Sequence, residues 1–157
     1  MGKVQESIEI GVPVRVAYNQ WTQFEEFPLF MEGVKEVRQL DDTHLLWVAK
    51  IGGKEHSWEA EITEQRPDER IAWRSVDGKT NAGLVTFRGL DGRTEVTVDM
   101  EWDEEGLLET LGSALGADER RVKRDLERFK ELIESRGRET GAWRGEVEQG
   151  RVTGSQG

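Results

Sequence analysis

The 157-residue sequence contains no cysteine and only two histidines, three prolines and one tyrosine. Without cysteine the chain cannot form disulfides, thiolate nucleophiles, or cysteine-ligated zinc and iron–sulfur sites. Two histidines are too few for a histidine-rich metal centre, so no metal is expected. Because glycine motifs that bind dinucleotides or phosphates are also missing, we expect no cofactor.

Positive charge is scarce as well, since 22 lysines and arginines face 32 acidic residues and the formal net charge is −10. A surface that binds nucleic-acid phosphates is normally basic, so nucleic acid is not an expected partner. No apolar run is long enough to span a bilayer, and residues 1–12 lack a signal-peptide pattern. We therefore expect no integral membrane association and a cytoplasmic location.

Apolar residues that alternate with polar ones predict seven β-strands, which cover residues 3–11, 34–40, 44–51, 54–65, 70–76, 82–88 and 93–102. Short turns rich in Gly, Asp and Pro join the last six, which favours antiparallel neighbours. Between the first two strands, a Pro-started segment ending at Trp21 and a second segment over 24–31 show helical spacing.

Helical spacing returns near Gly106 and continues to Arg136, with Gly112 and Gly116 as weak points. We expect one long C-terminal helix, kinked or broken around Gly116. Residues 1–136 would form one domain, and the glycine-rich residues 137–157 a flexible tail. Trp143 in this tail either docks on the protein's own surface or serves as a lid or partner-binding element.

These elements predict an α+β fold in which a curved sheet of seven antiparallel strands wraps the long C-terminal helix, with two short helices after the first strand. The sheet has one apolar face, and only the long helix is large enough to cover it. A curved sheet and one helix rarely pack without gaps. We therefore expect an apolar cavity between them, suited to an apolar ligand.

Three segments carry a resemblance to a known family. These are Ser7-Ile8-Glu9-Ile10-Gly11-Val12-Pro13, Trp21-Thr22-Gln23-Phe24-Glu25-Glu26-Phe27-Pro28 followed by Phe30-Met31, and Pro67-Asp68-Glu69-Arg70-Ile71-Ala72-Trp73. Over residues 3–136 the chain resembles the START-like (SRPBCC) superfamily, of the bacterial polyketide cyclase/dehydrase and lipid-transport type. The resemblance implies the helix-grip fold and supports catalysis only weakly.

The aromatic residues are the strongest functional feature, because most are predicted to lie on the same strand or helix face as aliphatic neighbours. They either fill the core or line a groove that stacks a planar or isoprenoid ligand. The predicted ligand-binding residues are Trp21, Phe24, Phe27, Phe30, Met31, Trp47, Trp58, Trp73, Phe87, Met100, Trp102, Leu111 and Leu115.

Few residues suit acid–base chemistry. His56 shares strand parity with Trp58, and Glu64 shares it with Ile62, so either could point into the cavity as a catalytic acid or base. The alternative for His56 is a cavity mouth or solvent. Arg74 and Arg88 are read as exposed partners of cross-strand carboxylates.

Two functions from different classes follow. The first is binding of a hydrophobic small molecule, such as a lipid, a quinone or a polyketide-like ring, in the cavity. The alternative is a polyketide cyclase or dehydratase that uses His56 or Glu64, so the sequence leaves enzymatic activity open. A third interpretation is a partner-binding protein that uses the Trp143 tail. Exposed sheet edges also leave a homodimer open.

Overall fold

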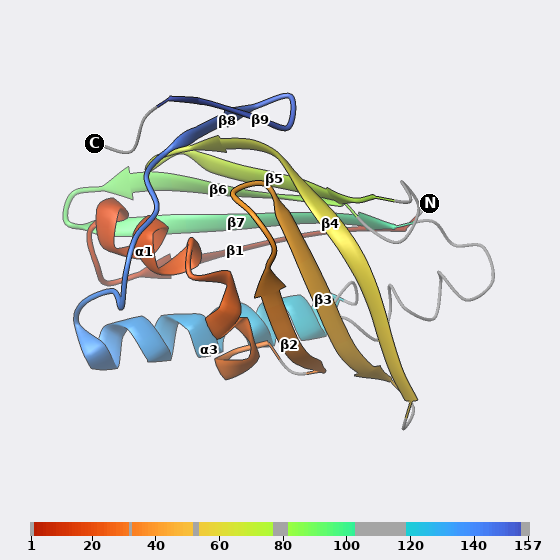
Figure 1. Ribbon diagram of the computed structural model, residues 1–157. Helices are drawn as coiled ribbons and strands as arrows, with labels where there is room; N and C mark the ends of the chain where they lie inside the picture. Colours follow the sequence, from red (N-terminus) through yellow and green to blue (C-terminus); the bar gives the residue numbers. More distant parts are fainter. Residues whose placement is uncertain (1, 32, 52–53, 77–81, 103–118, 155–157) are drawn as a thin grey trace.

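The computed structural model describes residues 2–31, 33–51, 54–76, 82–102 and 119–154. A curved antiparallel sheet wraps around one side of a C-terminal helix, and two short helical segments lie between them (Figure 1). The strands are β1 (Gly2–Ile10), β2 (Val34–Gln39), β3 (His44–Ile51), β4 (Lys54–Arg66), β5 (Arg70–Ser75), β6 (Ala82–Leu90), β7 (Arg93–Trp102), β8 (Glu146–Glu148) and β9 (Arg151–Gly154). The helices are α1 (Val14–Trp21), the 3-10 helix η1 (Phe24–Leu29) and α3 (Glu119–Arg136).

The sheet follows the order β1-β7-β6-β5-β4-β3-β2, and every neighbouring pair is antiparallel. These seven strands confirm the predicted helix-grip architecture. The predicted strand count is wrong, because the described residues contain nine strands. β8 pairs with Glu64 and Gln65 of β4, just past the point where β3 begins opposite Glu61, and β9 pairs with β8. β8 therefore continues the edge of β4 that β3 leaves free.

α3 presents an apolar stripe to the interior. Val122, Leu126, Phe129 and Ile133 are all buried and recur at spacings of four, three and four residues, as one helix face requires. Within the described ranges, no helix is both long enough and apolar enough to cross a membrane. The part of the predicted helix that precedes residue 119 lies outside the described residues.

Two hydrogen bonds fix the C-terminal half of α3 to the first strand and the turn that follows it. Lys130 Nζ donates to the backbone carbonyl of Glu9 at 2.8 Å, and the backbone N–H of Gly11 donates to Glu134 Oε2 at 2.7 Å. This backbone donor holds the pKa of the Glu134 carboxyl below its usual range. The contacts set where α3 lies along the sheet.

Trp21, at the end of α1, joins all the layers of the interior. Its ring centroid lies 4.8 Å from Phe129 of α3, 5.7 Å from Phe27 of η1, 5.6 Å from Phe30 and 6.2 Å from Phe87 of β6. Most of these pairs meet edge to face, the geometry that the ring quadrupole favours. The cluster packs one end of the space between sheet and helix solidly.

The segment after α3 docks on the polar side of α1. Gln20 and Thr22 are buried, and both bond to this segment: Gln20 Oε1 accepts from the Thr140 backbone N–H at 3.0 Å, and Thr22 Oγ1 accepts from the Trp143 backbone N–H at 3.1 Å. The Trp143 side chain packs against the core, and Val147 of β8 is fully buried. The division into a domain of residues 1–136 and a flexible tail of residues 137–157 stays a prediction.

Arg144 of the docked segment contacts three residues of the folded domain. Its guanidinium donates to Asn19 Oδ1 at 2.7 Å and to Asp68 Oδ2 at 2.8 Å, and it lies 5.5 Å from the centroid of the Tyr18 ring. Asp68 adopts a left-handed backbone conformation with φ of 64°. The arginine thus bonds α1, the β4–β5 turn and the chain end together.

Replacing Arg144 by Ala is expected to lower the free energy of unfolding by about 2 kcal/mol, because Asp68 and Asn19 lose a half-buried charged donor. Chemical denaturation measures the change. Arg138→Ala is the matched control, since Arg138 is an exposed arginine of the same segment. Equal effects of the two substitutions would contradict the role given to Arg144.

Candidate functional site

An apolar pocket lies between the curved sheet and α3, beside the Trp21 cluster. Its cavity volume is about 70 Å³, and it opens to solvent. Every layer of the fold contributes to its wall. The lining residues are Trp21, Phe24, Phe27, Met31, Val34, Leu45, Trp47, Trp58, Ile62, Ile71, Trp73, Val98, Met100, Val122, Asp125 and Leu126. Asp125 is the only charged residue among the described residues of the wall, so the wall favours an apolar guest.

Most of the predicted ligand-binding residues lie in this wall: Trp21, Phe24, Phe27, Met31, Trp47, Trp58, Trp73 and Met100. Phe30 and Phe87 are buried but do not line the pocket, because their rings pack into the aromatic cluster around Trp21. The Trp102 side chain, Leu111 and Leu115 lie outside the described residues. Ligand binding by the lining residues stays a proposal.

The wall also contains residues that the sequence analysis did not assign to the site. Val34, Leu45, Ile62, Ile71 and Val98 are aliphatic side chains on the inner face of the strands, and they alternate with outward residues. Asp125 lies on α3 between the buried Val122 and Leu126. The sequence signal that could have identified Asp125 is its spacing. It follows Val122 by three residues, so it lies on the same face of the helix as the apolar stripe.

Trp47 and Trp58 form a stacked pair within the wall. They are directly opposite each other in the β3–β4 register, with ring centroids 5.9 Å apart and planes inclined by 9°. Both indole nitrogens are buried, and neither has a hydrogen-bond partner among the described residues. The pair therefore contributes two stacked indole rings to the wall.

Glu64 does not line the pocket, which corrects the expected inward direction of its side chain. The β4–β5 register shifts between Ile62 and Glu64, and this β-bulge reverses the alternation. Glu64 instead forms ion pairs with Arg66 at 3.3 Å and Arg70 at 3.4 Å, while Gln65 is the buried residue. An acid–base role for Glu64 stays a prediction without support from this geometry.

His56 lies on β4 opposite Ala49 of β3 and is half-buried. It is absent from the pocket wall, although Trp58, two residues further along the same strand face, is present. The structure therefore does not bring His56 and Glu64 together, and the catalytic role of His56 stays a prediction.

Comparison with known proteins identifies the family of the chain. A sequence profile of the family described as polyketide cyclase / dehydrase and lipid transport matches residues 10–131. The chain belongs to this family. A 17.2 kDa protein of Streptomyces lincolnensis, described as uncharacterized, is 53% identical over 149 residues, which cover 94% of this chain and 99% of the relative.

Crystal structures with a similar fold include START-type proteins. A Deinococcus radiodurans protein has a TM-score of 0.69 and 30% identity, and the match covers 87% of this chain and 99% of that one. The Zhui aromatase/cyclase of a Streptomyces species gives 0.66 at 13% identity, covering 89% and 98%. A START superfamily protein of Mycobacterium smegmatis gives 0.62 at 14%, covering 87% and 97%. The last two similarities show the fold alone.

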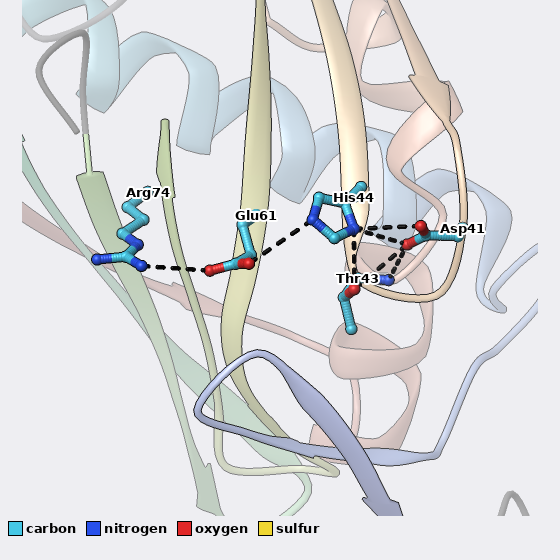
Figure 2. Close-up of polar contacts among 5 residues, drawn as sticks. All are labelled: Asp41, Thr43, His44, Glu61 and Arg74. Atoms are coloured by element: carbon cyan, nitrogen blue, oxygen red, sulfur yellow. Dashed lines mark hydrogen bonds and ion pairs between the residues drawn. The ribbon is translucent and has the colours of Figure 1, made fainter. Parts of the chain in front are cut away.

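The outer face of the sheet carries a series of polar contacts between residues that do not line the pocket (Figure 2). His44 Nδ1 lies 3.0 Å from Asp41 Oδ1, and His44 Nε2 lies 3.6 Å from Glu61 Oε2. Arg74 lies 3.5 Å from Glu61, as the cross-strand interpretation predicted, and Arg88 pairs with Glu95 at 3.0 Å. These contacts form a solvated, paired surface.

The turn before β3 gives Asp41 its partners. The backbone N–H of Thr43 donates to Asp41 Oδ1 at 2.8 Å, and this bond, with the His44 side chain, lowers the pKa of Asp41. Among the described residues, no group of three or more His, Asp or Glu side chains could hold a metal ion. The array therefore reads as a hydrogen-bonded turn that starts β3.

Within the part of the chain that the structure describes, Tyr18 is the one buried group whose pKa is strongly shifted. It is fully buried against Phe87, at a centroid distance of 5.3 Å, and none of the described residues forms a hydrogen bond of standard geometry with its hydroxyl. Burial raises the pKa of Tyr18 to about 12, and the nearby Gln65 side chain and Arg144 offset part of that rise. Gln65 is also fully buried, with neither amide atom bonded in standard geometry.

The pKa of Tyr18 makes the folded state lose stability at alkaline pH. Below the ordinary value of 10, both folded and unfolded chains keep the proton, and between 10 and about 12 only the folded chain keeps it. Stability therefore falls across this window, by about 3 kcal/mol in total. Tyr18→Phe removes this loss and keeps the ring contact with Phe87.

Denaturation of both proteins at a series of alkaline pH values measures the difference. Because Tyr18 is the only tyrosine, tyrosinate absorption also follows its ionisation directly. Parallel stability curves for the wild type and Tyr18→Phe, or titration of Tyr18 near the ordinary tyrosine pKa in the folded protein, would contradict the raised pKa of Tyr18.

Proposed function

We propose that this protein binds a hydrophobic small molecule, such as a lipid, a quinone or a polyketide-like ring, in the pocket between the curved sheet and α3. The observation that carries the proposal is the wall itself: of the sixteen described residues that line it, fifteen are apolar or aromatic, and Asp125 is the exception. Water in such a space gains few hydrogen bonds, so an apolar guest that displaces it is favoured.

The composition of the wall points to a flat or chain-like guest. Four of the protein's six tryptophans line the pocket, and they come from α1, β3, β4 and β5. Indole faces stack on planar rings and also accommodate alkyl chains. The family description, which covers both polyketide cyclases and lipid transport, fits either guest.

Polyketide cyclase or dehydratase activity is the second candidate, and the family description favours it. The aromatase/cyclase structure supports the same fold and nothing about residues, at 13% identity. Acid–base chemistry in the pocket needs a titratable group in contact with the substrate. Asp125 is a titratable residue of the wall, but His56 and Glu64, the residues predicted for catalysis, lie outside it, so binding is the better supported function.

The binding function is tested by titrating the protein with a fluorescent fatty acid and measuring its affinity. We expect saturable binding to the wild type. Met31→Trp fills part of the pocket with a larger side chain and should weaken binding about tenfold or more, because overpacking costs roughly 1–3 kcal/mol.

Leu29→Trp is the matched control for this substitution. Leu29 lies in the preceding η1 helix and is 56% exposed, so the same new side chain points into solvent there. It should leave affinity unchanged. Absence of saturable binding to the wild type, or equal weakening by both substitutions, would argue against the pocket as the binding site. Unchanged turnover of polyketide substrates by His56→Gln would exclude His56 from the second candidate.

A further inference from the structure

One row of cross-strand neighbours runs through the pocket wall, and it includes a glycine. Trp73 of β5 lies opposite Ile62 of β4 on one side and opposite Gly83 of β6 on the other. Gly83 in turn lies opposite Met100 of β7. Residues directly opposite one another project from the same face of a sheet, and Ile62, Trp73 and Met100 all line the pocket. A side chain at position 83 would therefore project from the pocket side of the sheet.

The indole of Trp73 occupies the space that such a side chain would need. A Cβ atom on Gly83 would lie 2.3 Å from Cζ2, 2.5 Å from Cη2 and 2.8 Å from Cε2 of Trp73. Ordinary van der Waals contacts of a Cβ atom begin at 3.4 Å. A glycine in the interior of a strand weakens the strand and often marks the close approach of another group. At Gly83, that group is the six-membered ring of the Trp73 indole.

The sheet also determines where the indole would go if position 83 carried a side chain. The added Cβ would project from the same face as Trp73 and would push the ring away from the sheet, at least by the difference between 2.3 and 3.4 Å. The pocket lies on that side, between the sheet and α3, and its cavity volume is about 70 Å³. In a cavity of this size, the displaced indole would take space from the ligand.

We propose that Gly83 is a positioning residue that keeps the ligand pocket open. Because it has no side chain, the Trp73 indole can lie against β6 and leave the space in front of it to an apolar guest. This inference rests on the proposed binding function and deepens it, since Gly83 does not itself line the pocket. Gly83 acts through Trp73, so its influence on binding depends on the indole.

Titration with the fluorescent fatty acid measures the effect of Gly83→Ala. We expect about tenfold weaker binding than in the wild type, because the added methyl group overpacks the wall. Gly89→Ala is the matched control on the same strand: its Cβ would lie 3.6 Å from the Val14 side chain, which is an ordinary contact. This substitution should change the affinity by less than about twofold.

Trp73→Leu distinguishes an effect through the indole from general damage to the sheet. Leucine keeps an apolar side chain and removes the three ring atoms that meet position 83. In the Trp73→Leu background, Gly83→Ala should change the affinity by less than about twofold, because two residues in contact do not act additively. An equal loss of affinity in both backgrounds would overturn the inference.

The wild-type protein provides a readout that needs no folded variant. An Hα proton of Gly83 should show a nuclear Overhauser effect to the six-membered ring protons of Trp73. Absence of this effect, or fatty-acid binding that Gly83→Ala leaves unchanged, would overturn the inference and leave the binding function standing. Failure of the wild type to bind the fatty acid would remove the binding function, and the role of Gly83 in binding with it.

Discussion

The contact between Trp21 and Phe129 determines how the interior is divided. It joins the short helical layer to α3, and the neighbouring rings of Phe27, Phe30 and Phe87 complete a solid cluster at that end. A curved sheet is wider than one helix, so the same packing cannot extend along its full length. The remaining space is the pocket, and its wall begins where the cluster ends, at Trp21, Phe24 and Phe27.

Polar groups in this apolar interior are treated in two different ways. On the side of α1 away from the pocket, the buried Asn19, Gln20 and Thr22 receive partners from the docked C-terminal segment. The indole nitrogens of Trp47 and Trp58, the Tyr18 hydroxyl and the Gln65 amide receive none from the described residues.

Much of this fold could be predicted from the sequence, because the strands are long and alternate regularly. The stripe of Val122, Leu126, Phe129 and Ile133 likewise identified α3. Two features had no such signal. The bulge beside Thr63 turned Glu64 outward and Gln65 inward, and parity cannot reveal a bulge. β8 and β9 span three and four residues, too few for a pattern to show. Whether a buried ring lines a pocket, like Trp47, or packs behind it, like Phe87, depends on tertiary contacts alone.

Native mass spectrometry of the protein isolated from its producing cells, followed by solvent extraction, tests the central claim most directly. If the pocket binds an apolar molecule, the folded protein should carry a mass excess that disappears on denaturation, and the extract should contain a hydrophobic compound of matching mass. A folded protein with the bare polypeptide mass, which also takes up no added hydrophobic compound, would contradict the account.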